Sequence, residues 1–291
     1  MSLFRSLLFA PGNHPRRIEK AFTLTADVVI LDLEDACPIA EKVATRPVVV
    51  EALQKPRRAL GYVRVNALST EFGYGDLCAI VQSGVDGVML TKVNAPDEIK
   101  IADWLITQLE RERGLPQGSI DLIPLIETGA GLANAEAIAR AAPRVKRLAF
   151  GAGDFTADLG LRWTREETEL LSFRSSLVLA SRAAGIEPPI DCAWLNTKDA
   201  EGLANSVRWA STLGFQGKLC IHPDHVEPIN HAFSPTAEEV ARAQRVVEAF
   251  REAEARGSAA FVLDGAMIDY AIVVQAERTL RAAARASAAK S

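Results

Sequence analysis

Eight short apolar segments, each followed by loop residues and then by a helical pattern, constrain the fold of this chain more than any other feature. Their starts lie between 22 and 42 residues apart, which leaves room for one helix between successive segments. This alternation is typical of parallel strands joined by helical crossovers, and uninterrupted apolar runs indicate strands buried on both faces. The expected strands are Ser6–Ala10, Val28–Leu33, Gly61–Val65, Gly87–Thr91, Asp121–Ile126, Arg147–Gly151, Pro189–Trp194 and Gly217–Ile221.

The number of strands favours a closed sheet. Eight parallel strands that alternate with helices can form a (β/α)8 barrel or an open, doubly wound sheet. The G-x-G-x-x-G fingerprint of a dinucleotide-binding open sheet is missing from the sequence. We therefore predict an α/β fold, a (β/α)8 TIM barrel over residues 1–230. Residues 231–291 are predicted to form a C-terminal helical extension that serves as a lid, an oligomerisation arm or both.

The helices are marked by amphipathic spacing and by capping residues. Thr164–Gly185 opens with a Thr-x-x-Glu pattern, Thr164 to Glu167, which predicts a capping box at the start of that helix. The other expected helices include Pro96–Arg113, Lys198–Leu213, Ala237–Arg256 and one from about Met267 to Ala284.

Composition excludes several classes of function. The net charge is −4, from 33 Lys and Arg against 37 Asp and Glu, so a general nucleic-acid binder is not expected. Four cysteines without a C-x-x-C pair indicate neither a zinc site nor a disulfide framework. The sequence carries no apolar run of about 18 residues and no signal-peptide pattern, so we expect a cytoplasmic protein without a membrane partner.

Two acidic residues follow neighbouring strands of the expected barrel. The chemistry of such barrels lies at the carboxyl ends of the strands, where Glu127 and Asp154 follow the fifth and sixth apolar segments. Adjacent strands lie about 5 Å apart, so both carboxylates could bind one Mg²⁺ whose remaining positions are left to water and substrate. The alternative is that each carboxylate caps the following helix or pairs with a Lys or Arg of the rim.

Two basic residues are expected at the same end of the barrel. Arg64 lies inside the third apolar segment, where its guanidinium could hold a substrate carboxylate in two hydrogen bonds. A salt bridge to Glu34 or Asp35 is the alternative. Lys92 follows the fourth segment and could suggest a Schiff-base aldolase, but a lysine close to two carboxylates stays protonated, so we expect an electrostatic role.

Two further patterns remain ambiguous. Gly12 and Asn13 form a turn before the first helix, which is either an anion site or an ordinary tight turn. His222 and His225 form an H-x-x-H pair, but Pro223 breaks the helix that would align them, which favours structural roles over zinc. Because no strand end pairs Ser or Cys with His, acyl-enzyme chemistry is not expected.

Six ordered segments resemble the β-subunit family of citrate lyase, within the wider HpcH/HpaI aldolase group. They are RSLLFAPGN, ILDLEDA, VRVNAL, LIPLIET, FGAGDF and GFQGKLCIHP, and the similarity runs from about Arg5 to Ala271. The resemblance implies a TIM barrel that assembles as trimers or hexamers. It also implies a carbon–carbon lyase that uses Mg²⁺ to cleave a 3-hydroxyacyl-CoA such as citryl-CoA into acetyl-CoA and a 2-oxo acid such as oxaloacetate.

The resemblance also implies roles for residues at matching positions. Glu127 and Asp154 correspond to the metal ligands, and Arg64 corresponds to the group that holds the carboxylate of the oxo acid. Other residues expected near the CoA, the substrate or the water around the metal are Gly12, Asn13, Glu34, Asp35 and Lys92.

A C-terminal segment completes the site in several relatives, where a Met-Ile-Asp sequence of a neighbouring subunit closes over it and its Asp transfers a proton. The segment MIDYAIV supplies Asp269 for this role, so the lid could act in trans. This chain departs from the family pattern after Asp269, where the sequence reads Tyr270-Ala271 and relatives commonly have Pro second, and at Gly153, where many relatives have Glu. Neither change removes a predicted metal ligand.

Two other functions remain open from the sequence. One is a metal-dependent aldolase that acts on free 4-hydroxy-2-oxo acids. The other is a 2-oxo-acid-binding subunit of a larger complex with little turnover of its own. The sequence also leaves open which oxo acid is the product, and whether the thiol partner is CoA or an acyl carrier.

Overall fold

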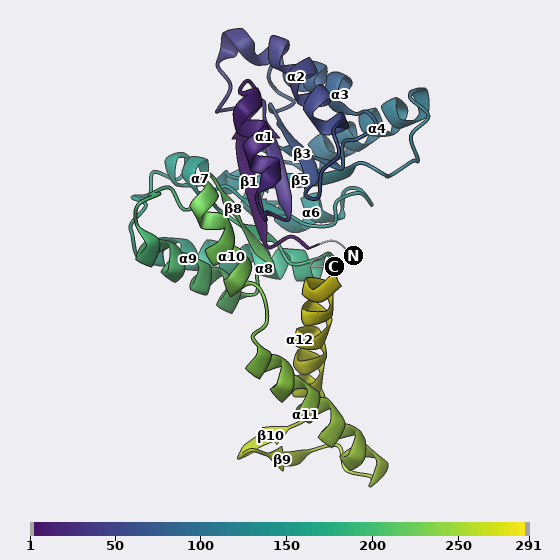
Figure 1. The fold of residues 1–291 in the computed structure, drawn as a ribbon, viewed down its shortest axis with the longest axis vertical. Coiled ribbons are helices and arrows are strands. Elements are labelled where there is room, and N and C mark those ends of the chain that lie inside the picture. Colours follow the sequence, from purple (N-terminus) through teal and green to yellow (C-terminus); the bar gives the residue numbers. More distant parts are fainter. Residues whose placement is uncertain (1–2, 289–291) are drawn as a thin grey trace. The chain divides into compact units, whose positions relative to one another are not determined.

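Eight parallel strands close into a barrel in the computed structural model of the chain, which describes residues 3–288. Each strand pairs with the next, and the last pairs with the first (Figure 1). All eight expected strands are present, so the predicted TIM barrel is confirmed. The strands are β1 Ser6–Pro11, β2 Val28–Asp32, β3 Leu60–Val65, β4 Gly87–Leu90, β5 Asp121–Ile126, β6 Ala149–Phe150, β7 Ile190–Asp191 and β8 Gly217–Cys220.

The barrel is filled by the apolar side chains that mark the strands in the sequence. Leu7, Ile30, Met89 and Ile123 come from four different strands and meet in one buried cluster. Strands β2 and β5 are buried along their whole length. Burial on both faces explains why these segments carry no alternation of polar and apolar residues.

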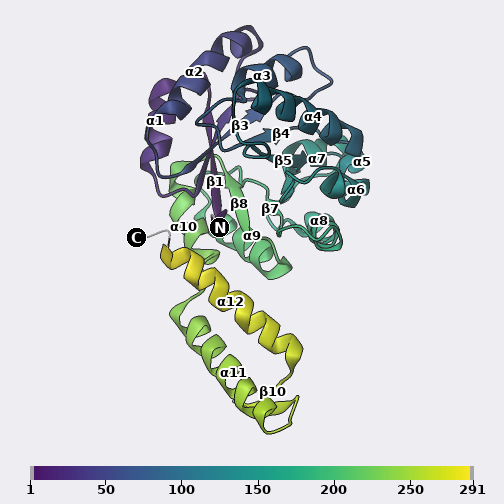
Figure 2. The same ribbon diagram turned by 90° about the vertical axis from the view of Figure 1, so that its right-hand side faces the viewer.

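Helices surround the strands as an outer layer (Figure 2). Most follow a strand directly, as the crossover pattern requires. They are α1 Pro15–Thr23, α2 Lys42–Gln54, α3 Gly73–Ile80, α4 Pro96–Glu112, α5 Gly129–Ala133, α6 Ala135–Arg140, α7 Ala152–Asp158, α8 Leu171–Ala183, α9 Ala200–Leu213 and α10 Val226–Ala232, with short 3-10 turns at Ile39–Glu41, Thr168–Leu170 and Pro223–His225.

The predicted capping box between Thr164 and Glu167 is wrong. Glu167 has a φ angle of 54°, which no helix can contain, and α8 begins only at Leu171. The amide and hydroxyl of Thr164 instead donate to the carboxylate of Glu169. The carboxylate of Glu167 contacts the side chains of Trp163 and Arg174.

A second compact unit begins at His231. It contains α11 Ala237–Ala255, the antiparallel hairpin of β9 Phe261–Leu263 and β10 Ala266–Ile268, and α12 Tyr270–Ala288. Residues of α11, β10 and α12 share one apolar cluster. The hairpin is an addition to the two helices that the sequence predicts for this region.

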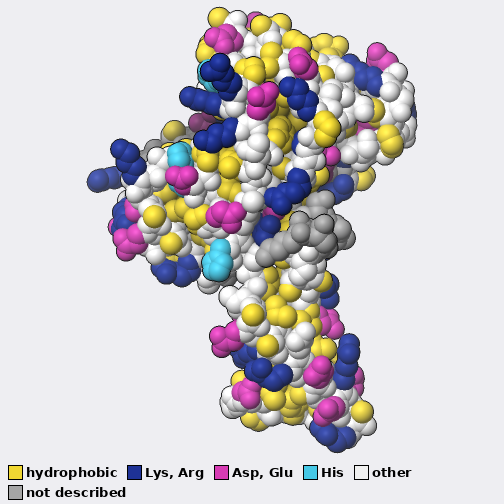
Figure 3. All heavy atoms as spheres, viewed as in Figure 1, with side chains coloured by type: hydrophobic (Ala, Val, Ile, Leu, Met, Phe, Trp, Pro, Cys, Tyr) yellow, Lys and Arg dark blue, Asp and Glu magenta, His cyan; other side chains and the backbone are white. Residues whose placement is uncertain are grey.

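The structure also describes the hydropathy of the helices and the distribution of surface charge. No helix among them combines the length and apolarity that a membrane crossing requires. On the face drawn in Figure 3, the Lys and Arg side chains are interspersed with Asp and Glu rather than gathered in one stripe.

Gly217 allows a close approach at the seam of the barrel, and its substitution tests the register of β8. A Cβ at this position would lie 1.8 Å from the carbonyl oxygen of Phe4 and 2.5 Å from that of Arg5. These carbonyl groups directly precede β1, the strand that pairs with β8, and cannot move away without disturbing that pairing. Gly217→Ala should therefore lower the free energy of unfolding by about 3 kcal/mol or more. Urea denaturation measures this loss.

Gly153→Ala is the control for that measurement, because its added Cβ would meet no atom within 4 Å. Its free energy of unfolding should stay within about 0.5 kcal/mol of the wild type. A loss below about 1 kcal/mol for Gly217→Ala would show that the seam can relax, contrary to this expectation.

Candidate active site

A cavity of about 840 Å³ opens at the carboxyl ends of the barrel strands. Residues near the carboxyl ends of several strands line it, among them Asp35, Arg64, Glu127 and Asp154. The predicted location of the chemistry therefore coincides with a cavity large enough for a small-molecule ligand.

A two-pronged ion pair joins β2 to β3 at this cavity. Asp32 and Arg64 occupy paired positions in the two strands. Nε of Arg64 donates to Oδ1 of Asp32 at 2.8 Å, and Nη2 donates to Oδ2 at 2.6 Å. Burial alone would raise the pKa of Asp32, which is 1% exposed, but the charge and hydrogen bonds of Arg64 hold that pKa below its ordinary value.

The same carboxylate fixes the loop that follows β2. The backbone amides of Glu34 and Ala36 donate to Asp32 at 2.9 and 3.0 Å. From the other side, Nζ of the buried Lys42 donates to the carbonyl oxygens of Leu33 and Glu34 at 2.9 and 2.5 Å. The loop that presents Glu34 is therefore held by charged groups on both sides.

Glu34 lies between the two cations of the site. Its Oε2 lies 3.0 Å from Nη1 of Arg64, and its Oε1 accepts a hydrogen bond from Nζ of Lys92 at 2.8 Å. Asp35 lies 3.6 Å from the same Nη1. Burial raises the pKa of Glu34 and the charge of Asp35 adds to it, although Arg64 and Lys92 oppose this.

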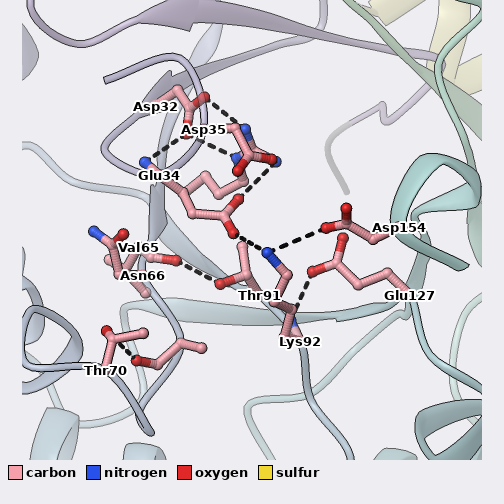
Figure 4. Close-up of polar contacts among 12 residues, drawn as sticks. Asp32, Glu34, Asp35, Val65, Asn66, Thr70, Thr91, Lys92, Glu127 and Asp154 are labelled. Carbon is pink, nitrogen blue, oxygen red and sulfur yellow. Dashed lines mark hydrogen bonds and ion pairs between the residues drawn. The ribbon is translucent and has the colours of Figure 1, made fainter. Parts of the chain in front are cut away.

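Lys92 connects three carboxylates (Figure 4). Besides Glu34, its Nζ lies 3.2 Å from Oδ2 of Asp154, and its backbone amide donates to Oε1 of Glu127 at 2.7 Å. The backbone of Lys92 has a φ angle of 52°, a conformation that non-glycine residues rarely adopt outside functional sites. Burial would lower the pKa of Lys92, but Glu34 and Asp154 raise it above its usual value, so the ammonium group stays charged.

Glu127 is the most strongly perturbed acid of the group. It is 3% exposed, and burial, followed by the charges of Glu34 and Asp154, raises its pKa to about 8. Oxygens of Glu34, Asp35 and Asp154 lie within 4.8 Å of one another, and Glu127 does not belong to this group of three, although the charge of Asp154 acts on it (Figure 4). The structure therefore places Glu127 and Asp154 in the wall of one cavity, with Asp154 in a compact acidic group beside Glu34 and Asp35.

The other predicted residues lie outside the acidic cluster. The amide of Gly12 donates to the carbonyl oxygen of Asp32 at 2.9 Å, and a Cβ on Gly12 would lie 2.7 Å from that oxygen, so close packing requires a glycine there. Asn13 donates to Glu41 at 2.6 Å. Asp269 belongs to the second unit, where its carboxylate accepts the amide of Ile272 at the start of α12.

Comparison with known proteins identifies the group to which the chain belongs. The sequence profile of the HpcH/HpaI aldolase/citrate lyase family matches residues 5–223. The β subunit of citrate lyase from Leuconostoc mesenteroides is 36% identical over 283 residues, which cover 97% of this chain and 93% of that protein. This chain belongs to the HpcH/HpaI aldolase/citrate lyase family. The resemblance seen in the six sequence motifs is thereby confirmed.

Other members of the family are similar over nearly their whole length. The L-malyl-CoA/β-methylmalyl-CoA lyase of Cereibacter sphaeroides is 34% identical in an alignment of 306 positions, gaps included, that covers 98% of this chain and 96% of that enzyme. The CitE protein of Mycobacterium tuberculosis in complex with magnesium, acetoacetate and coenzyme A is 31% identical, with a TM-score of 0.79 over 97% of this chain and 98% of that chain. A citrate lyase β subunit from M. tuberculosis complexed with oxaloacetate and magnesium is 31% identical, with a TM-score of 0.66 over 80% of this chain and 98% of that chain.

Some residues that organise the site are not evident from the sequence. Asp32 lies within an apolar segment, although an acid that ends a buried strand beside a strand carrying Arg64 signals an ion pair. Lys42 carries no comparable signal, because its contacts are made to backbone carbonyls. Trp163 lines the cavity from the loop before α8, and it directly precedes the helix that the sequence predicts from Thr164.

The pKa of Glu127 predicts how stability depends on pH in metal-free protein. Between its unfolded pKa, near 4.5, and its folded pKa of about 8, the folded chain keeps a proton that the unfolded chain releases. Stability contributed by this group is therefore lost as the pH rises through that window. Glu127→Gln removes the titration, so the variant should be more stable than the wild type at pH 8, by on the order of 3 kcal/mol.

Thermal unfolding in a chelator at pH 5, 6, 7 and 8 measures this difference. The advantage of Glu127→Gln should be small at pH 5 and should grow toward pH 8. A constant difference across the series would contradict the assignment of the proton to Glu127. Glu136→Gln, on the exposed face of α6, is the control and should show no such trend.

Proposed function

We propose that this chain is a Mg²⁺-dependent carbon–carbon lyase that cleaves a 3-hydroxyacyl-CoA, of the citryl-CoA type, into acetyl-CoA and a 2-oxo acid such as oxaloacetate. The observation that carries the proposal is the acidic cluster at the mouth of the barrel. There, five carboxylates face the two cations Arg64 and Lys92. Relatives named as citrate lyase β subunits and malyl-CoA lyases support the class of reaction.

The residues of the cluster fit a divalent cation. When all five carboxylates are ionised, they exceed the charge of Arg64 and Lys92 by three, and a bound Mg²⁺ would offset most of that excess. Their oxygens are the hard donors that Mg²⁺ prefers. Glu127 and Asp154 would hold the ion, with Glu34 and Asp35 close to its water shell. Mg²⁺ would supply Lewis-acid stabilisation of the negative charge that develops on the substrate oxygen.

The proposed reaction is a reversible retro-Claisen cleavage. The hydroxyl group loses its proton, the bond between C2 and C3 breaks, and the electron pair of that bond passes to C2 as the enolate of acetyl-CoA. C3 becomes the carbonyl carbon of the 2-oxo acid. A proton added to C2 then completes acetyl-CoA, and no covalent enzyme intermediate is required.

The chain's own residues would orient the substrate and move the proton. Arg64 lines the cavity and would bind the substrate carboxylate, while Asp32 keeps its guanidinium plane fixed. Lys92 would remain an ammonium group that stabilises negative charge. Asp269 would protonate the enolate from a lid that acts in trans, within a homotrimer or hexamer. Gly12 and Asn13 would lie beside the CoA.

Turnover assays test the proposal against its alternatives. Purified protein with 5 mM MgCl₂ should release acetyl-CoA from citryl-CoA or malyl-CoA, and Glu127→Gln should lower kcat/KM by at least about a hundredfold, because it removes a charged metal ligand. Release of pyruvate from 4-hydroxy-2-oxo acids, without cleavage of CoA esters, would instead indicate the aldolase. Magnesium-dependent binding of oxaloacetate without any turnover would indicate a binding subunit.

Arg64→Lys tests the geometry of the proposed carboxylate grip. Lysine keeps the charge but cannot form the fork to Asp32 and reach Glu34 at the same time. We expect kcat/KM to fall on the order of a hundredfold, since small misplacements of an orienting group have effects of that size. Steady-state kinetics with the cleaved CoA ester measure the loss.

Arg5 provides the matched control. It forms a similar fork to Asp27, with Nε and Nη2 donating at 2.9 and 2.7 Å, but it lies before β1 at the amino end of the barrel. Arg5→Lys should therefore leave kcat/KM within about twofold of the wild type. Equal losses in Arg64→Lys and Arg5→Lys would show that the fork supports only the fold.

A further inference from the structure

Glu167 is a buried carboxylate in a backbone conformation that side chains rarely adopt. Its φ angle is 54°, in the left-handed region, and only 1% of its surface is exposed. That conformation costs stability in any residue except glycine, and it persists only where the surrounding structure holds it. The contacts of its carboxylate show what holds it.

The two oxygens of this carboxylate face different partners. Oε1 accepts a hydrogen bond from the indole Nε1 of Trp163 at 3.2 Å, and Oε2 lies 2.9 Å from Nη2 of Arg174. The fully buried Arg174 donates to both oxygens of Asp191, which also accepts from Lys218 at 2.6 Å. Glu167 thus links Trp163 to a buried network of two cations and two anions.

Trp163 lies in the wall of the candidate active site. Its half-buried side chain lines the cavity, as does Asp154. The loop that carries Trp163 follows α7, and the first turn of this helix presents Asp154. The indole and the predicted metal ligand therefore reach the cavity from α7 and from the loop that follows it.

The loop is fastened at three successive residues. Besides the bond from Trp163, the amide and hydroxyl of Thr164 donate to Glu169, and the guanidinium of Arg165 donates to both oxygens of Asp199. The three residues therefore donate to three different carboxylates. A loop held in this way presents Trp163 as a fixed surface rather than as part of a mobile lid.

We propose that Glu167 is a positioning residue that holds Trp163 as a fixed aromatic wall of the cavity, and that this wall contributes to binding of the CoA thioester. The inference rests on the proposed function. An indole offers apolar contact but no charge for the carboxylate of an oxo acid, so Trp163 strengthens binding without entering the chemistry. The competing interpretation is that Glu167 serves only to balance the charge of Arg174.

Three variants separate these two roles. Glu167→Gly accepts the left-handed backbone but loses both contacts of the carboxylate. Glu167→Gln loses the charge but keeps an oxygen that can accept the indole N–H. Trp163→Phe loses the N–H and leaves the pair of Glu167 and Arg174 intact. Glu166→Gln, at the exposed residue next to Glu167, is the control for removal of a carboxylate.

Positioning predicts a specific pattern in KM for the thioester. Glu167→Gly and Trp163→Phe should each raise KM about three- to tenfold, with a much smaller effect on kcat. Glu167→Gly should add little in the Trp163→Phe background, and Glu167→Gln should stay close to the wild type, as should the Glu166→Gln control. A Gln variant as impaired as the Gly variant, or independent effects of the Glu167 and Trp163 substitutions, would support charge balance alone and overturn the proposal.

A spectrum without turnover provides the second measurement. The chain has four tryptophans, and in protein labelled with 5-fluorotryptophan the ¹⁹F signal of Trp163 is the one that Trp163→Phe removes. It should be a single narrow line that shifts when CoA and MgCl₂ are added, and it should broaden or divide in Glu167→Gly. This measurement and the KM of Trp163→Phe decide the matter if Glu167→Gly does not fold.

The two proposals fail in different ways. Absence of turnover with every CoA ester, in protein whose Trp163 signal still responds to CoA, would overturn the proposed lyase but keep the assigned wall. Turnover with an unchanged KM in Trp163→Phe, or a Trp163 signal that does not respond to CoA, would overturn the inference and leave the lyase intact.

Discussion

The fork between Asp32 and Arg64 is the interaction on which the geometry of the candidate site depends. A buried ion pair stabilises a fold only when its geometry is good and its remaining hydrogen-bonding capacity is used. Here two guanidinium N–H groups and two backbone amides meet one carboxylate. Because Asp32 and Arg64 occupy paired positions in β2 and β3, the register of the barrel itself places the guanidinium and the loop that carries Glu34.

The barrel could be predicted from the sequence because its signal is local. Each strand buried on both faces must be apolar along its length, so the segments of the barrel are visible one by one, and their number favours closure. Residues that end or follow these segments, such as Glu127 and Lys92, could be assigned to one rim for the same reason. What the sequence could not supply was which of those groups touch, because that depends on pairs 32 to 58 residues apart in the chain.

The errors have a common physical cause. Thr164 and Glu167 match a capping box in spacing, yet the carboxylate of Glu167 is bound by Arg174 and Trp163, and no local pattern reports a competing long side chain. The ion pair of Asp32 is hard to predict, because in the sequence a buried acid at the end of an apolar strand looks like an interruption of the core. Local rules fail where a charged group is claimed by tertiary partners, and these are the places where the cavity is built.

Two groups of charged side chains in the barrel differ in net charge. Around Arg174, two cations meet two anions, and all four side chains are buried, so the group is neutral. Around Arg64, five carboxylates meet two cations, and burial together with the neighbouring acids holds the pKa of Glu127 near 8. A fold gains nothing from such an excess of like charge, which costs stability unless a ligand offsets it. The unbalanced group, and not the more deeply buried one, is therefore where a cation and an anionic substrate are expected to bind.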